Sequence, residues 1–122
     1  MRRYAANILY CSPYNLLKNG VVEIDEQKGV ITDIFSLDNF GDEVHSTVFL
    51  NGIILPFKPV FTPDMYGSNL FVLLKEQFLK NVSCEIACFE KIDLWVLQGG
   101  DLFGEGGVRG DWRVTRVLTW AL

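Results

Sequence analysis

The sequence predicts a mainly β fold, a small β-sandwich or composite sheet of about seven strands from the two ends of the chain, with one α-helix. Two observations support this. Short runs rich in valine, isoleucine and aromatic residues recur along the chain between turn residues, which is typical of strands. Only residues 68–80 space their apolar side chains at the three- to four-residue period of a helix.

Size and composition indicate a single globular domain, residues 1–122. A chain of 122 residues can bury one core and is too short for two. With 49% hydrophobic and 21% charged residues, it has the composition of a folded protein. The formal net charge is -4 and the basic residues are scattered, so we expect no nucleic-acid partner.

Three of the strands expected in residues 1–56 form an antiparallel meander. The first, residues 4–11, ends at a Ser-Pro turn. Asn19-Gly20 follows and is the residue pair favoured in a type I′ hairpin turn, which leads to a second strand at residues 21–25. Another turn signal, QKG, precedes the third strand at residues 30–35.

The hydrophobic centre of the sequence is TVFLNGIILP, residues 47–56. Almost all of it is apolar or β-branched, with Asn51-Gly52 in the middle and a proline at the end. We expect a deeply buried strand pair, or one strand broken at a tight turn.

A connector and a helix come next. Residues 57–67 contain two further prolines and are expected to be irregular. The helix is expected at residues 68–80, with Ser68 or Asn69 as its N-cap and Asn81 at its end.

The return strands are expected within residues 83–122. Residues 83–89 alternate polar and apolar side chains, and residues 92–98 have the apolar content of a buried strand. Residues 99–110, GGDLFGEGGVRG, contain six glycines and are predicted to be a flexible loop. Residues 112–120 alternate again and predict a terminal strand.

The N-terminal half contains the runs YAANILYC, NGVVEID, GVITDIFSL and TVFLNGIILP, and the C-terminal half contains LLKEQFLKN, FEKIDLWVLQGGDL and WRVTRVL. In this order they resemble the amidohydrolase (metal-dependent hydrolase) superfamily with its catalytic barrel absent. In that family, strands before and after the barrel form one small composite β-sandwich. The resemblance covers most of the chain except residues 57–67 and 99–110.

One departure from that family concerns its metal site. Family members enter the barrel with a His-x-His metal-binding pair, whereas the corresponding positions here are about Thr62 and Asp64. The one histidine, His45, precedes the central strand, and a barrel of about 250 residues is missing. The resemblance therefore implies a non-catalytic structural or protein-interaction module, with no catalytic, cofactor-binding or metal-binding residues. Two alternatives remain open: an accessory subunit of an amidohydrolase whose barrel lies on another chain, and a small-ligand binder that uses the loop from Gly99 to Gly110.

Individual candidate residues support no stronger site. His45 lies in a polar loop and is more simply an exposed or hydrogen-bonded histidine. Cys84 and Cys88 share a predicted strand face, but they are more simply buried small side chains than metal ligands. The loop of residues 99–110 could hold phosphate with Arg109 as counter-charge, yet it lacks the P-loop lysine and precedes a strand.

Two pairs of acidic residues could act as carboxylate pairs in acid/base chemistry. Turn formation and solvation explain both pairs more simply, Asp93 with Asp101 and Asp25 with Glu26.

Partners and location follow from the aromatic residues and the cysteines. Six aromatic residues exceed what a small core buries, so a homodimer or another protein partner is the open hypothesis. With three cysteines, no export signal and no apolar run of about 18 residues, we expect reduced thiols, no membrane partner and a cytoplasmic location. The six aromatic residues are Phe57, Phe61, Tyr66, Trp95, Trp112 and Trp120.

Overall fold

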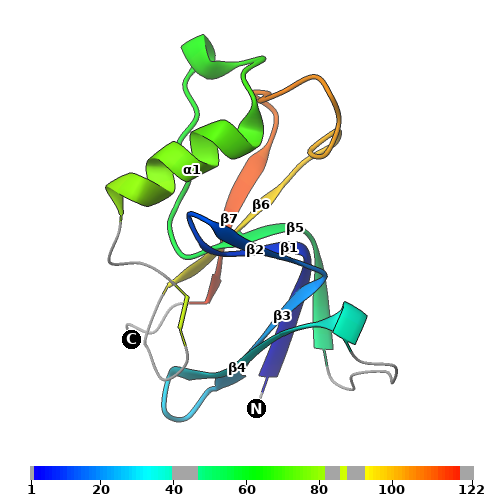
Figure 1. Ribbon diagram of the computed structural model, residues 1–122, viewed down its shortest axis with the longest axis vertical. Coiled ribbons are helices and arrows are strands. Elements are labelled where there is room, and N and C mark those ends of the chain that lie inside the picture. The colour runs from blue at the N-terminus through cyan, green and yellow to red at the C-terminus, as the bar shows by residue number, and fades with distance from the viewer. Residues whose placement is uncertain (1, 40–46, 82–85, 88–92, 119–122) are drawn as a thin grey trace.

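The structure is a computed structural model that describes residues 2–39, 47–81, 86–87 and 93–118 (Figure 1). It is mainly β with one α-helix among these residues, as predicted. The elements in chain order are β1 (Arg2–Ser12), β2 (Asn15–Lys18), β3 (Gly20–Asp25), β4 (Val30–Ser36), a short 3-10 helix (Leu37–Asn39), β5 (Thr47–Leu55), a second 3-10 helix (Pro63–Met65), α1 (Leu70–Lys80), β6 (Leu94–Gln98) and β7 (Arg113–Leu118).

The seven strands form one mixed sheet in the order β4-β3-β1-β5-β6-β7, with β2 also paired to β1. β1 and β5 are parallel, and the other pairs are antiparallel. β5 pairs with β6 through Ile53 opposite Leu97. Strands from both ends of the chain therefore share one sheet, which confirms the predicted composite sheet.

The first hairpin differs from the prediction. The chain reverses at Pro13 and Tyr14, between β1 and an unpredicted strand, β2. β2 and β3 then run in one register along β1, so the prediction of a hairpin turn at Asn19-Gly20 is wrong. Asn19 does have a positive φ of 50°, but there its backbone N–H donates to the Asn7 carbonyl at 2.8 Å. The residue therefore interrupts one long strand instead of reversing the chain.

β5 is continuous, so the predicted break at Asn51-Gly52 is wrong. Its pairing with β1 runs from Thr47 to Ile54 with a shift of register between Leu50 and Ile53, so Asn51-Gly52 forms a bulge within the strand, and Gly52 does not adopt a positive φ. Gly52 instead allows β6 to approach, because a Cβ there would collide with the Leu97 carbonyl oxygen. Only the second half of β5 is deeply buried, since the first half includes exposed residues.

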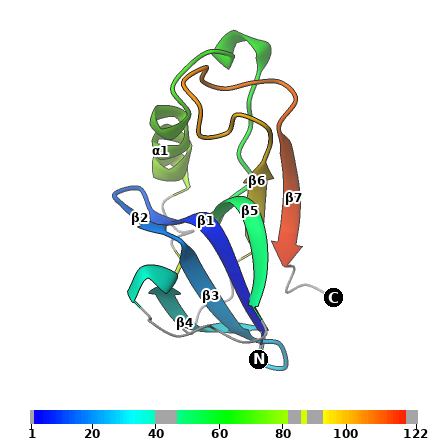
Figure 2. The same cartoon turned by 90° about the vertical axis from the view of Figure 1, so that its right-hand side faces the viewer.

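The core lies on both faces of this sheet. Side chains alternate along β5 and β6, so Ile53 and Ile54 belong to different apolar clusters. Figure 2 shows α1 on one side of the sheet, where it covers the second cluster. The first cluster contains Tyr4, Ala6, Leu9, Cys11, Val22, Ile24, Ile31, Ile54, Ile86, Leu94 and Val96, and the second contains Tyr10, Ile53, Leu55, Phe57, Leu70, Leu74, Phe78, Leu97, Leu102 and Val108.

The helix is close to its predicted bounds. Its buried residues Leu70, Leu74 and Phe78 follow the four-residue step of the sequence. Of the two proposed N-caps, Asn69 is the one that caps, because its Oδ1 accepts from the Val72 N–H at 3.1 Å. Asn81 ends the helix as predicted.

We expect Asn69→Ala to lower the free energy of unfolding by about 1 kcal/mol, because one N–H in the first turn loses its acceptor. Urea denaturation followed by circular dichroism measures this change. Ser68→Ala is the matched control, with an expected change within about 0.5 kcal/mol. Equal losses in the two variants would contradict the assignment of the cap.

The connector of residues 57–67 packs against α1. The Gln77 side chain accepts from the Val60 N–H at 2.9 Å and donates to the Val60 carbonyl at 2.7 Å. Phe57 is buried against the ring of Phe78. The connector and α1 therefore cover a sheet face that, from the sequence alone, a second copy of the chain could also have covered.

Other predicted aromatic residues are partly covered as well. Trp112 is half-buried, packs edge-on against Phe61 and donates from Nε1 to the Gly100 carbonyl at 3.0 Å. Trp95 is half-buried, Tyr66 is exposed, and Trp120 lies outside the described residues.

The predicted strand at residues 83–89 is largely outside the described residues. Ile86 and Ala87 are described, and neither belongs to a strand. Ile86 nevertheless joins the core, and its N–H donates to the Cys11 carbonyl at 2.9 Å.

Candidate functional site

The glycine-rich loop, residues 99–110, has no helix or strand, as predicted, but it is anchored to the protein. Leu102 and Val108 are buried in the same cluster as α1. The Val108 N–H donates to the Ser68 carbonyl at 2.9 Å, and its own carbonyl accepts from Gly67 at 2.8 Å. The loop is therefore attached to the segment that begins the helix.

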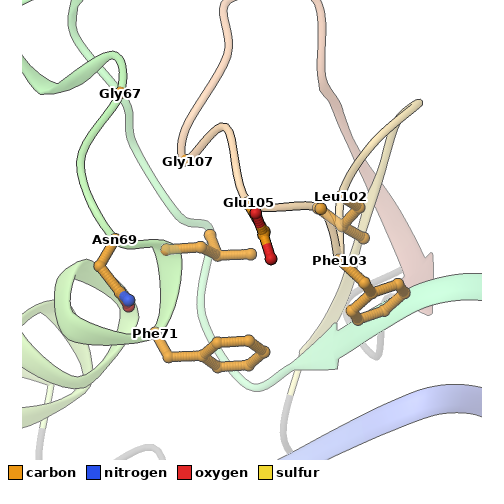
Figure 3. Close-up of a pocket in the computed structure, with 9 residues that line it drawn as sticks. Gly67, Asn69, Phe71, Leu102, Phe103, Glu105 and Gly107 are labelled. Carbon is orange, nitrogen blue, oxygen red and sulfur yellow. The ribbon is translucent and has the colours of Figure 1, made fainter.

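A hollow of about 330 Å³ lies between this loop and the N-terminus of α1. Figure 3 shows the Glu105 carboxylate pointing into it, between the side chains of Phe71 and Phe103. A bound phosphate would meet a like charge there.

Arg109, the counter-charge considered for a phosphate site, is occupied elsewhere. Its guanidinium pairs with Asp101 at 2.9 Å and lies 3.5 Å from Asp111. It is not among the residues that line the hollow. The arrangement of the loop therefore does not favour an anionic ligand.

The described thiol and the neighbouring phenol belong to the core. Burial raises the pKa of the Cys11 thiol to about 11, so it is protonated at neutral pH and is a poor nucleophile. Burial also raises the pKa of Tyr10, whose hydroxyl donates to the Pro13 carbonyl at 3.2 Å. Both side chains contribute to packing.

The acidic residues considered as catalytic pairs have separate partners. Asp93 and Asp101 flank opposite ends of β6, and Asp93 lies 3.9 Å from Arg116. Asp25 accepts the backbone N–H groups of the turn that follows it, while Glu26 pairs with an arginine of β1. Turn and ion-pair roles thus account for both pairs.

His45, Cys84 and Cys88 lie outside the described residues. Thr62 and Asp64, which occupy the positions of the His-x-His pair, are exposed and hydrogen-bonded to each other. In the described part of the chain, no group of three or more histidine, cysteine or acidic side chains is arranged to hold a metal ion. None of its helices is both long and apolar enough to cross a membrane.

Comparisons with protein-family models, curated proteins and solved structures find no match.

One surface with exposed apolar residues is the side of α1 that faces away from the sheet. Val72 and Leu79 are 54% and 41% exposed, and Lys75 and Glu76 lie between them. The spacing i, i+3, i+4, i+7 places all four on one helix face. This face is opposite the buried stripe that includes Leu74.

Tyr14, in the turn between β1 and β2, extends this surface. It is 77% exposed, and the Lys75 ammonium lies 4.8 Å from the centre of its ring. We call Tyr14, Val72, Lys75, Glu76 and Leu79 together the outer face of α1.

The helical period in the sequence predicts the buried stripe of α1 but does not predict this surface. Residues 70–74 are all apolar, so their pattern does not distinguish inward from outward positions. The sequence does contain one signal for it. Val72 and Leu79 are seven residues apart, which places them on one helix face, and neither belongs to the four-residue spacing of Leu70, Leu74 and Phe78.

Proposed function

We propose that this chain is a non-catalytic module that acts through protein contacts, and that the outer face of α1 is its contact surface. The observation that carries the proposal is the pair of exposed aliphatic side chains, Val72 and Leu79, on the same helix face as Lys75, whose ammonium lies 4.8 Å from the centre of the exposed Tyr14 ring. Apolar side chains grouped on a surface are typical of an interaction site.

The fold alone gives no reason for aliphatic residues at these positions. The helix already contacts the core through Leu70, Leu74 and Phe78. At an exposed helical position, valine forms helix less well than glutamate, lysine or glutamine. A contact with another protein would explain Val72, because its side chain would then be removed from water.

The proposal includes a relation to the small domain of the amidohydrolases. Its support is the arrangement of β5 and β6, which resemble the strand entering the barrel and the strand returning from it. They are antiparallel neighbours, with Leu55 opposite Trp95. A cytoplasmic location is also part of the proposal, since the buried Cys11 is a free thiol.

Site-specific photo-crosslinking in cells that produce the protein tests the contact surface. We expect a photoreactive residue at Glu76, in the centre of the outer face, to give covalent adducts. The same residue at Lys28, exposed in the turn between β3 and β4, should give none.

A Val72→Ser/Leu79→Ser variant should lose the adduct at position 76 while keeping its circular dichroism spectrum, because both side chains are partly exposed. The proposal fails if position 76 gives no adduct, or if both positions react equally.

A further inference from the structure

The hollow between the glycine-rich loop and the start of α1 contains groups that attract a positively charged ligand. The carboxylate of Glu105 points into it, between the ring of Phe71 from the helix and the ring of Phe103 from the loop (Figure 3). Carboxylates and the faces of aromatic rings both attract cations, and aromatic side chains are the groups that recognise quaternary ammonium ligands.

The negative charge of Glu105 is unpaired. Its carboxylate takes part in no ion pair or hydrogen bond within the described part of the chain. Arg109, from the same loop, pairs with Asp101 and lies near Asp111 instead. Residues 99–111 contain three acidic side chains and one basic side chain, a net charge of -2. A cation in the hollow would therefore neutralise a charge that the loop leaves free.

The N-terminus of α1 borders the same hollow, and its dipole alone would favour an anion. That dipole is equivalent to about half a positive charge, which is less than the full charge of Glu105. The helix does not need this carboxylate as a cap, because Asn69 Oδ1 already accepts from the Val72 N–H at 3.1 Å. The two opposing effects therefore leave the hollow negative.

Two anchors fix the part of the loop that lines the hollow. Leu102 and Val108, on either side of residues 103–107, are buried in the core. Gly107 has a positive φ of 73°, and a Cβ there would collide with the backbone of Gly67. The lining side chains are therefore held in place before a ligand binds, which lowers the entropy cost of binding.

The ring of Phe103 has no packing role that explains it. It is 49% exposed, whereas the neighbouring Leu102 is buried and attaches the loop to the core. A ligand in the hollow would remove part of this apolar ring from water.

We propose that the hollow binds a small, free organic cation that carries a quaternary ammonium group. Glu105 neutralises its charge, and the rings of Phe71 and Phe103 contact its methyl groups. A volume of about 330 Å³ is at the low end of the roughly 300–1,000 Å³ of ligand pockets, so the compound is small.

Other cations fit the hollow less well. A metal ion needs several oxygen ligands, and Glu105 is the one carboxylate among the described residues that line the hollow. A primary ammonium is strongly hydrated and needs hydrogen-bond acceptors in place of its water, whereas two of the groups here are hydrocarbon rings.

Titration of choline into the full chain, followed by NMR spectra of the backbone amides, tests the site. We expect saturable shifts of the amides of residues 102–107, with a dissociation constant on the order of 1 mM, because few groups hold the ligand. The uncharged isostere of choline, in which a tert-butyl group replaces the trimethylammonium group, should bind at least about tenfold more weakly.

Two variants test the groups that hold the cation. Glu105→Gln keeps the size of the side chain and removes its charge, so choline binding should weaken about three- to fivefold. Phe103→Leu keeps an apolar side chain and removes the ring, so binding should weaken about threefold. Both residues are exposed, so both variants should keep the NMR spectrum of a folded chain.

Glu26→Gln is the matched control, because it makes the same chemical change in the turn between β3 and β4, at the opposite end of the molecule (Figure 1). It should leave choline binding unchanged within about 1.5-fold. Phosphocholine joins the same cation to a phosphate, as a lipid headgroup does. It should bind more weakly than choline, because its phosphate meets an acidic loop.

Any of four results would overturn the proposal: no saturable shift at about 20 mM choline, equal binding of choline and its uncharged isostere, unweakened binding by Glu105→Gln, or phosphocholine binding as tight as that of choline. The last result would assign the hollow to a headgroup instead of a free cation. No residue of the outer face of α1 lines the hollow, so this proposal and the proposed contact fail independently.

Discussion

Phe78→Ala is expected to lower the free energy of unfolding by about 3–5 kcal/mol. Phe78 is fully buried, and its ring centre lies 5.3 Å from that of Tyr10 and 5.1 Å from that of Phe57. Removal of the ring would leave a cavity between the helix, the sheet and the connector, and it would remove both aromatic contacts. Urea denaturation measures the loss.

Leu79→Ala is the control for this prediction. Leu79 follows Phe78 in the same helix but is 41% exposed on the outer face. Truncation of Leu79 should lower the free energy of unfolding by no more than about 1 kcal/mol. Similar losses of stability in the two variants would show that α1 does not bury the side that carries Phe78.

The expected loss of stability in Phe78→Ala has a consequence for the proposed contact. Domains of this kind are stable by about 5–15 kcal/mol, so Phe78→Ala would remove a large share of the total. The outer face of α1 exists only while the inner face is held on the sheet. We therefore expect Phe78→Ala to reduce contact formation together with stability, whereas Val72→Ser/Leu79→Ser should reduce contact formation alone.

Local sequence signals predicted the helix well. Its period and its caps at Asn69 and Asn81 are set by neighbouring residues, and the same interactions form in the structure. The expectation of mainly β structure was right for the same reason, since β-branched residues recur at strand spacing.

Two local turn signals predicted the wrong structure, because contacts with distant parts of the chain determine the conformation at those positions. Asn51-Gly52 and Asn19-Gly20 are both hairpin-turn pairs by local chemistry. In the structure, Gly52 provides room for β6 from the far end of the chain, and Asn19 hydrogen-bonds to β1. A sequence pattern alone does not show which strand will lie beside a glycine.

The candidate site was less predictable than the fold. The outer residues of α1 can be identified only when the contacts of its inner side are known. Here those contacts are between Phe78 and the rings of Tyr10 and Phe57. The anchoring of the glycine loop was missed for a similar reason, because Leu102 and Val108 are two apolar residues in a stretch dominated by glycine. Their burial outweighs the freedom that the glycines give the chain.

Gly52→Ala is expected to destabilise the protein by about 3 kcal/mol, although it adds only one methyl group. The added Cβ would collide with the backbone oxygen of Leu97, and backbone atoms in a paired strand cannot move aside as a side chain can. β6 must shift away from β5, which weakens the pairing of Ile53 with Leu97. Urea denaturation and hydrogen exchange of the Leu97 amide measure the two effects.

Gly100→Ala is the matched control, because a Cβ at Gly100 would have no neighbouring atom within 4 Å. Its effect should lie within about 0.5 kcal/mol of zero. The comparison decides whether the sheet is continuous between the two halves of the chain, since β5 and β6 are the strands that join them. If Gly52→Ala is tolerated as well as Gly100→Ala, the close approach of these strands is wrong. The shared sheet that supports the proposed relation to amidohydrolase small domains would then be lost.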